Sequence, residues 1–181
     1  MVQFTTFNDL KSFNRNLATN SQVILKAAYS KGNKDTFLSH SSKDAEYLPG
    51  VIELLEKHGA SVYCDLDDDR MPETPNPDTA KIIKGQIQES KKLVVFVTIN
   101  SKDSKWVPWE LGIGDASLTT SNVALLPVAN NSYEQSWAKQ EYLGIYRHIV
   151  YGALQGEPKP VWMVYDYRTN TATKLSKWFR G

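Results

Sequence analysis

The chain has 181 residues, of which 41% are hydrophobic and 23% charged, values ordinary for a globular protein. A formal net charge of +1 gives no electrostatic reason to expect nucleic acid as a partner. No apolar run approaches the roughly 20 residues of a transmembrane helix, so no membrane span is expected. Residues 1–10 lack the basic and apolar regions of a secretory signal.

The content of cysteine and histidine excludes two further classes of site. Cys64 is the only cysteine, so no intrachain disulfide can form, which fits a reducing, cytoplasmic location. The pattern favours a buried, inert Cys64 over a reactive thiol. His40, His58 and His148 are scattered along the chain without the spacing of metal ligands, and we expect no metal site.

The first third of the chain predicts a helical lead-in, a strand and a helix. Within residues 1–33, apolar residues recur at helical spacing, which indicates one or two short amphipathic helices packed on the domain or on another subunit. A short strand is expected at 35–38, followed by polar residues that suit a turn and a helix N-cap. The next helix should begin near Tyr47, because Pro49 is tolerated only in a first turn, and should stop at Gly59.

The remaining elements alternate between strand and helix. A strand at 60–64 leads into an acidic, proline-containing loop at 65–77, and Asp78 can cap a helix that runs to about Ser90. The apolar residues 93–98 predict a buried strand, followed by a helix from Pro108 to Leu118. Further strands are expected at 123–128, 147–151 and 161–165, with a helix at 133–142.

This alternation predicts a mostly parallel sheet with helices on both faces. Ligands bind such sheets outside the carboxyl ends of the strands. Polar residues follow three predicted strands: the cluster 39–42, Asp65, and the segment 100–106. The topology therefore brings them to one rim of the sheet.

Three collinear segments resemble the Toll/interleukin-1 receptor (TIR) domain family. Residues 35–44, DTFLSHSSKD, are similar to the opening strand and loop of these domains. Residues 87–97, IQESKKLVVFV, resemble the central passage from helix to strand. Residues 106–112, WVPWELG, resemble the Trp-x-x-x-Glu-Leu box of bacterial and plant members. The resemblance covers about residues 35 to 150.

The resemblance implies a flavodoxin-like three-layer fold, with a central five-stranded parallel sheet and helices on both faces. We expect an N-terminal helical extension at 1–33, the TIR domain at 34–151, and a C-terminal extension at 152–181 packed on that domain. No second domain that could act as sensor or effector is expected.

The resemblance also implies an NAD⁺ glycohydrolase or cyclase of the bacterial kind, which gives nicotinamide and ADP-ribose or a cyclic isomer. Glu110 then corresponds to the catalytic residue, and Trp106 lies beside the substrate. Five residues border the nucleotide cleft in this interpretation: Ser39, His40, Ser41, Ser42 and Asp65. NAD⁺ is the substrate, and no cofactor is expected.

The chemistry of this bond explains why one carboxylate is enough. Ordinary glycoside hydrolysis uses two carboxyl groups, because the leaving alkoxide must be protonated. Nicotinamide departs from its cationic form as a neutral molecule and needs no general acid. Glu110 could stabilise the oxocarbenium-like ribose by its charge and accept hydrogen bonds from the ribose hydroxyls. Stacked aromatic rings such as Trp106 would exclude water and favour cyclisation.

Structural interpretations of these residues remain open on the sequence alone. Glu110 could be a first-turn carboxylate that complements the helix dipole. Residues 39–42 could serve only as turn and cap, and Trp106 could be a core aromatic. The rival interpretation is a non-catalytic TIR interaction module, an adaptor or host-interfering effector. A weaker alternative is a deoxyribosyltransferase-like enzyme of the same fold.

The family resemblance implies partners as well. TIR domains assemble through TIR–TIR contacts, so a homo-oligomer is expected. In the family the loop after the second strand mediates assembly, but here it lacks a Pro-Gly tip. We also expect a separate effector protein that responds to the nucleotide product in antiphage defence.

Overall fold

The structure is a computed structural model that describes residues 2–15, 24, 28, 34–66, 76–131 and 144–181. The strands are β1 (Thr5–Thr6), β2 (Thr36–Ser39), β3 (Val62–Tyr63), β4 (Lys92–Val97), β5 (Val123–Ala129), β6 (Arg147–Gly152), β7 (Val161–Asp166) and β8 (Thr171–Lys174). The α-helices are α1 (Phe7–Arg15), α3 (Leu48–Glu56), α4 (Pro77–Glu89), α5 (Trp106–Leu118) and α6 (Leu175–Arg180). Three 3-10 helices, η1 (Ser42–Tyr47), η2 (Ile99–Asp103) and η3 (Thr120–Asn122), complete the list.

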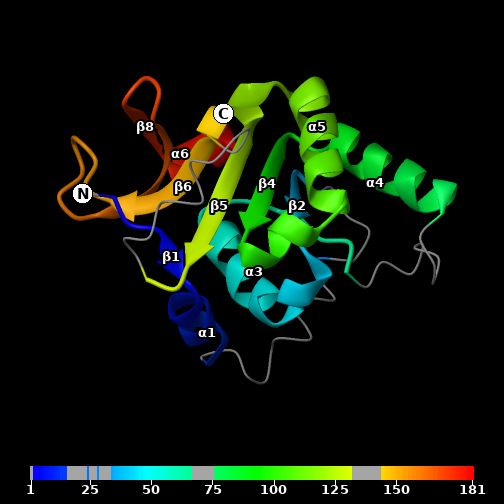
Figure 1. Cartoon of the computed structure of the whole chain (residues 1–181). Helices are drawn as coiled ribbons and strands as arrows, with labels where there is room; N and C mark the ends of the chain where they lie inside the picture. The colour runs from blue at the N-terminus through cyan, green and yellow to red at the C-terminus, as the bar shows by residue number, and fades with distance from the viewer. Residues whose placement is uncertain (1, 16–23, 25–27, 29–33, 67–75, 132–143) are drawn as a thin grey trace.

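One sheet holds these elements together, in the order β3-β2-β4-β5-β6-β7-β8 (Figure 1). The five strands from β3 to β6 run parallel, whereas β7 and β8 are antiparallel additions beyond β6. Numbered along the chain, the parallel strands have the order 2-1-3-4-5, which is the flavodoxin-like order. The predicted fold is confirmed. The strand order reverses between β2 and β4, and ligands bind such sheets at the carboxyl ends beside this switch point.

Alternate side chains of the buried strands face two different hydrophobic clusters. One face of the sheet packs against α1, α3 and α6, and its core includes Leu38, Val94 and Leu126. The other face packs against α4 and α5, and its core includes Phe37, Leu93 and Leu125. Figure 1 shows α4 and α5 together on one side of the sheet, α3 below β4 in the view, and α1 next to β1. The expected layers, with helices on both faces, are present.

The structure confirms one predicted helix start and corrects two others. The helix predicted near Tyr47 does begin at Leu48, but η1 already makes residues 42–47 helical. The N-cap of α4 is Asn76 and not Asp78, because the Asn76 side chain accepts hydrogen bonds from the backbone N–H groups of Asp78 and Thr79. Helix α5 begins at Trp106, two residues before Pro108. The predicted helix at 133–142 and most of the loop at 65–77 lie outside the described residues.

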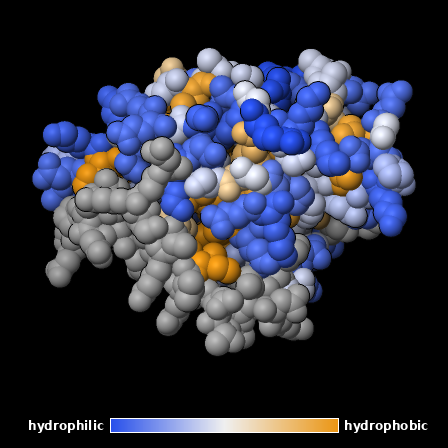
Figure 2. Space-filling view, turned by 180° about the vertical axis from the view of Figure 1, so that it is seen from behind, coloured by the Kyte–Doolittle hydropathy of each residue, from blue (hydrophilic) through white to orange (hydrophobic). Residues whose placement is uncertain are grey.

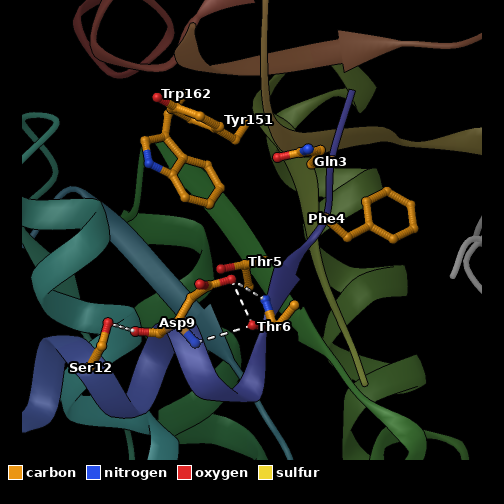
Figure 3. Close-up of a pocket in the computed structure, with 8 residues that line it drawn as sticks. All are labelled: Gln3, Phe4, Thr5, Thr6, Asp9, Ser12, Tyr151 and Trp162. Atoms are coloured by element: carbon orange, nitrogen blue, oxygen red, sulfur yellow. Dashed lines mark hydrogen bonds between the residues drawn. The ribbon is translucent and has the colours of Figure 1, made fainter. Parts of the chain in front are cut away.

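The N-terminal residues contribute a strand that the sequence did not predict. β1 pairs in parallel with the end of β5, and α1 follows it directly. A reciprocal capping box starts α1: the Thr6 N–H donates to Asp9 Oδ2 at 2.8 Å, and the Asp9 N–H donates to Thr6 Oγ1 at 3.1 Å (Figure 3). The predicted amphipathic helix is therefore present at 7–15, with Leu10 fully buried against the core. In the region of the second predicted helix, the described residues are Ile24 and Ala28, both of them helical.

The close approach of α1 to α3 gives a first testable prediction. A Cβ atom at Gly50 of α3 would lie 2.5 Å from the backbone carbonyl oxygen of Leu10. We expect Gly50→Ala to lower the free energy of unfolding by about 1–3 kcal/mol, because backbone cannot move aside cheaply. Gly85→Ala in α4 is the matched control, since nothing lies within 4 Å of its added Cβ. It should raise stability by about 0.5–1 kcal/mol in urea unfolding. Equal changes for both variants would contradict this packing.

The C-terminal helix is fixed at the amino ends of the parallel strands. Trp178 Nε1 in α6 donates to the carbonyl oxygen of Ser121, just before β5, at 2.9 Å. Lys92, the first residue of β4, lies 4.8 Å from the centre of the Trp178 ring, and its ammonium donates to Asn122 at 2.7 Å. This end of the sheet is thus closed by structural contacts, and the opposite rim is left for a ligand.

The distribution of hydrophobic residues indicates whether the chain offers a binding surface or a membrane span. Hydrophobic residues appear as small, separate patches on the face shown in Figure 2. Among the described residues, no helix is both long and apolar enough to cross a membrane.

Candidate active site

A buried carboxylate sits at the switch point of the sheet. Ser39 is the last residue of β2, and Glu110 lies in the second turn of α5, which follows β4. The Ser39 hydroxyl donates to Glu110 Oε2 at 2.5 Å, although the two residues are 71 positions apart. Ser39 is fully buried and Glu110 is 3% exposed. The two residues therefore meet at the edge of the sheet that the topology predicted. Their hydrogen bond lies at the centre of the candidate site.

The surroundings of Glu110 favour the protonated form of its carboxyl group. Burial raises its pKa from 4.5 to about 7, and the negative charge of Asp65 adds to the rise. The hydrogen bond from Ser39 and the charge of His40 act in the opposite direction. The interpretation of Glu110 as a first-turn carboxylate is wrong, because α5 begins four residues earlier. A carboxyl group with such a pKa in a site at a strand rim is a candidate for chemistry.

His40 follows β2 and meets the residues that follow β3. Its Nδ1 atom lies 3.8 Å from Cys64 Sγ and 3.6 Å from Asp65 Oδ1. Burial alone would lower the pKa of His40, but Cys64, Asp65 and Glu110 raise it to about 10. A positive imidazolium beside Glu110 and Asp65 results. Cys64 is fully buried, as the sequence predicted, but its contact with His40 was not foreseen.

The group of His40, Cys64 and Asp65 is not a nucleophilic triad. Such a triad uses the two ring nitrogens of histidine separately, one toward the nucleophile and one toward the carboxylate. Here Cys64 and Asp65 both approach Nδ1, and Cys64 is inaccessible to a substrate. Glu110 therefore remains the candidate for chemistry at this site.

The remaining predicted residues lie around this centre. Ser41 is buried at the N-cap of η1, where its side chain makes no capping bond, and Ser42 is exposed on η1. Trp106 is half-buried at the start of α5, one turn before Glu110 and on the same helix face. Its ring meets that of Trp109 edge-on, with centres 5.3 Å apart. Trp106 also packs against the core of the α4–α5 face.

Residues 36–160 match the profile of the family described as "TIR domain". The chain belongs to the TIR domain family. The matched residues span β2 to the connection between β6 and β7, and so include both Ser39 and Glu110. The resemblance that the three sequence segments indicated is confirmed.

Two relatives of this TIR domain carry functional names. The chain is 38% identical over 137 residues to "Probable 3' cyclic ADP-D-ribose synthase ThsB'" of Bacillus cereus (strain MSX-D12), across 72% of this chain and 70% of the relative. It is 36% identical over 80 residues to "Putative cyclic ADP-D-ribose synthase TIR2" of Cytobacillus dafuensis. That second match covers 42% of this chain and about a fifth (21%) of the relative.

A second buried carboxylate of this TIR domain escaped the sequence analysis. Asp44 in η1 is fully buried, and it accepts hydrogen bonds from the Thr98 hydroxyl at 2.7 Å and from the Asn100 side chain at 2.6 Å. Thr98 and Asn100 follow β4, while Asp44 follows β2. The carboxylate thus joins the segment that follows Ser39 to the segment between β4 and α5, the helix of Glu110. The only feature of the sequence that pointed to Asp44 was its position shortly after the serines of residues 39–42.

Other hollows of the TIR domain lie away from these residues. One of about 470 Å³ lies beside β1 and α1, with Tyr151 and Trp162 in its wall (Figure 3). Another, of about 480 Å³, lies between α4 and α5 and is lined by Trp109. Neither lining includes a predicted site residue.

Proposed function

We propose that this TIR domain cleaves the nicotinamide–ribose bond of NAD⁺, with Glu110 as its catalytic residue. The observation that carries the proposal is the buried Glu110 carboxylate, held by Ser39 at the switch point of the sheet. The names of the two relatives, both cyclic ADP-D-ribose synthases, support the same reaction class. The products would be nicotinamide and ADP-ribose or a cyclic ADP-ribose isomer.

The chemistry assigns a role to each neighbour. The bond to nicotinamide breaks with its electron pair moving to the pyridinium, which leaves as a neutral ring. Positive charge develops on the ribose, and ionised Glu110 stabilises it across a short distance in a buried setting. Ser39 positions the carboxylate. His40, Ser41, Ser42 and Asp65 border the nucleotide, and Trp106 forms a wall that excludes water.

Exclusion of water selects between the two products. The ribosyl cation is captured by whichever nucleophile is nearest, either water or a group of the same ADP-ribose. Because Glu110 lies beneath the surface, we favour the internal nucleophile and hence the cyclic isomer. NAD⁺ is then a substrate consumed in each turnover, and no cofactor takes part in the reaction.

The proposed function also includes assembly of the chain into a homo-oligomer. Glu110 is only 3% exposed, so NAD⁺ can reach it only when surrounding residues move. Two apolar side chains lie exposed on elements of the site region: Ile99 of η2, 66% exposed, and Trp109 of α5. We propose that TIR–TIR contacts in a homo-oligomer cover them and open the site. The product would reach a separate effector in the cytoplasm, as a signal in antiphage defence.

Incubation of the purified protein with NAD⁺ tests the proposed function. Nicotinamide and the ADP-ribose products are separated by retention time and mass, over protein concentrations that cover dilute and assembled states. We expect stoichiometric release of nicotinamide and a cyclic isomer, with a rate per subunit that rises with concentration. No nicotinamide at any concentration would favour the non-catalytic interaction module.

The pH dependence of the rate gives a second testable prediction. Ionised Glu110 is the active form, so kcat/KM should rise as the pH increases through about 7, the pKa of that carboxyl group. Ser39→Ala removes a hydrogen bond that lowers this pKa, so the midpoint should move to higher pH. Ser117→Ala, an exposed serine of α5, is the matched control and should leave the profile in place. A midpoint common to all three proteins would refute this role of Ser39.

A further inference from the structure

Three side chains with different metal-binding atoms meet at the carboxyl ends of β2 and β3. His40 Nδ1, Cys64 Sγ and an Asp65 carboxylate oxygen all lie within 4.8 Å of one another. Their positions 40, 64 and 65 follow no zinc-ligand spacing, which is why the sequence predicted no metal site. We propose that His40, Cys64 and Asp65 bind a zinc ion.

Two of the three distances between these atoms are close to those around a tetrahedral ion. Zinc bonds of about 2.0–2.3 Å to N, O and S ligands place neighbouring ligand atoms roughly 3.3–3.6 Å apart. The observed distances from His40 Nδ1 are 3.8 Å to Cys64 Sγ and 3.6 Å to Asp65 Oδ1. The third pair, Cys64 Sγ and the Asp65 carboxylate, lies within 4.8 Å, and rotation of the Asp65 side chain, which is 22% exposed, would bring the carboxylate closer.

The ligand types select zinc among the common divalent ions. Calcium and magnesium take oxygen ligands, whereas a thiolate and an imidazole suit zinc. Cys64 is fully buried and the His40 side chain is 4% exposed, so both are fixed by their surroundings. The Asp65 side chain is 22% exposed and gives an ion access from solvent. Three protein ligands leave a fourth position for water.

Binding would displace protons that the free site holds. His40 Nδ1 lies 3.3 Å from the Leu38 carbonyl oxygen, so a proton on this nitrogen can be donated there. Zinc takes the lone pair of Nδ1, whose proton passes to solvent, and binds the sulfur of Cys64 as a thiolate. Binding of the ion therefore strengthens as the pH rises.

An ion in this position would inhibit the reaction proposed above. His40 and Asp65 border the nucleotide in that proposal, and zinc would hold both side chains against Cys64. This consequence rests on the proposed function, whereas binding of the ion does not. The two are measured separately.

Binding is tested by titrating metal-free protein with Co²⁺ and then displacing it with Zn²⁺. We expect visible absorption of a tetrahedral Co²⁺ site, with a thiolate-to-metal charge-transfer band in the near ultraviolet. Cys64→Ser should lose the charge-transfer band and weaken Zn²⁺ binding by on the order of 100-fold. His58→Gln is the matched control: its half-buried imidazole contacts the Leu54 carbonyl oxygen, outside the cluster, and its spectrum should be unchanged.

These measurements test zinc binding separately from its inhibition of NAD⁺ cleavage. Absence of the charge-transfer band in the folded wild-type protein, verified by circular dichroism, would overturn the zinc site. Its persistence in Cys64→Ser or its loss in His58→Gln would do the same. In the NAD⁺ assay, Zn²⁺ should slow the wild type at least tenfold but leave Cys64→Ser near its own zinc-free rate. A band without NAD⁺ turnover in any protein would keep the zinc site and reject the proposed function.

Discussion

Glu110→Gln is expected to lower NAD⁺ cleavage by a factor of about 100 to 1,000. The substitution keeps the shape of the side chain but removes the charge that would stabilise the ribosyl cation. Loss of one buried electrostatic group at a reacting centre typically costs this much. Release of nicotinamide by the wild type and the variant, at equal protein concentration, measures the effect. Turnover that survives the substitution would remove Glu110 from the mechanism.

The same substitution should stabilise the fold above neutral pH. Since the pKa of Glu110 rises from 4.5 to about 7 on folding, the folded state binds a proton more tightly than the unfolded state. This contribution to stability is fully present below the unfolded value and is lost as the pH rises through about 7. A shift of this size corresponds to a loss on the order of 3 kcal/mol. Gln cannot ionise, so the variant escapes that loss.

Urea unfolding at about pH 5 and about pH 8 checks this result. The wild type should lose stability between the two values, and the loss should be smaller in Glu110→Gln. Asp115→Asn, an exposed carboxylate on the same helix, should behave as the wild type. A carboxylate kept for structure would give the reverse: lower stability of Glu110→Gln at the higher pH. Loss of activity with gain of stability is the signature of a residue retained for function.

Asp44→Ala is expected to cost about 2–4 kcal/mol in the free energy of unfolding. The carboxylate is fully buried and accepts from the Thr98 hydroxyl and the Asn100 amide. Its removal leaves two donors without their acceptor and a small cavity beside η1. Each buried donor left unpaired costs about 1–3 kcal/mol, and relaxation of the connections recovers part of the total.

Two comparison variants separate the lost hydrogen bonds from other effects. Asp44→Asn keeps the volume and one acceptor oxygen, so its loss of stability should be smaller than that of Asp44→Ala. Asp103→Ala, an exposed carboxylate on η2, should change stability by less than about 0.5 kcal/mol. Equal stabilities of Asp44→Ala and the wild type would show that the two connections are held by other contacts.

The central strands were predictable because burial on both faces leaves a continuous apolar run. β4 was expected at 93–98 and lies at 92–97, and β5 was expected within one residue of its end. β8 has the sequence Thr-Ala-Thr-Lys and only its pairing with β7 makes it a strand. Helix α6, with six residues, is too short to show a helical period, and β1 has only two.

For the candidate site, the topology predicted a rim but not its contacts. Residues at the carboxyl ends of neighbouring parallel strands must lie close, and Ser39 and Glu110 do. Ser39 and Glu110 are 71 positions apart, and tertiary packing decides whether their side chains point toward each other. No local sequence pattern encodes that packing. The start of α5 at Trp106 is a similar case, because the sequence offered Pro108 as the first-turn signal. Because α5 begins two residues earlier than predicted, Glu110 lies in its second turn and not in its first.

The position of α6 makes self-association measurable with a single fluorophore. Cys64, the only cysteine, is fully buried and should resist thiol reagents in the folded protein. A cysteine introduced at Lys177, exposed on α6, would therefore carry the label alone. This helix is attached at the amino ends of β4 and β5, and six residues of β4 span roughly 20 Å from there to the rim of Glu110. Energy transfer between labelled copies would then report assembly during turnover, with the dye held away from the reacting nucleotide.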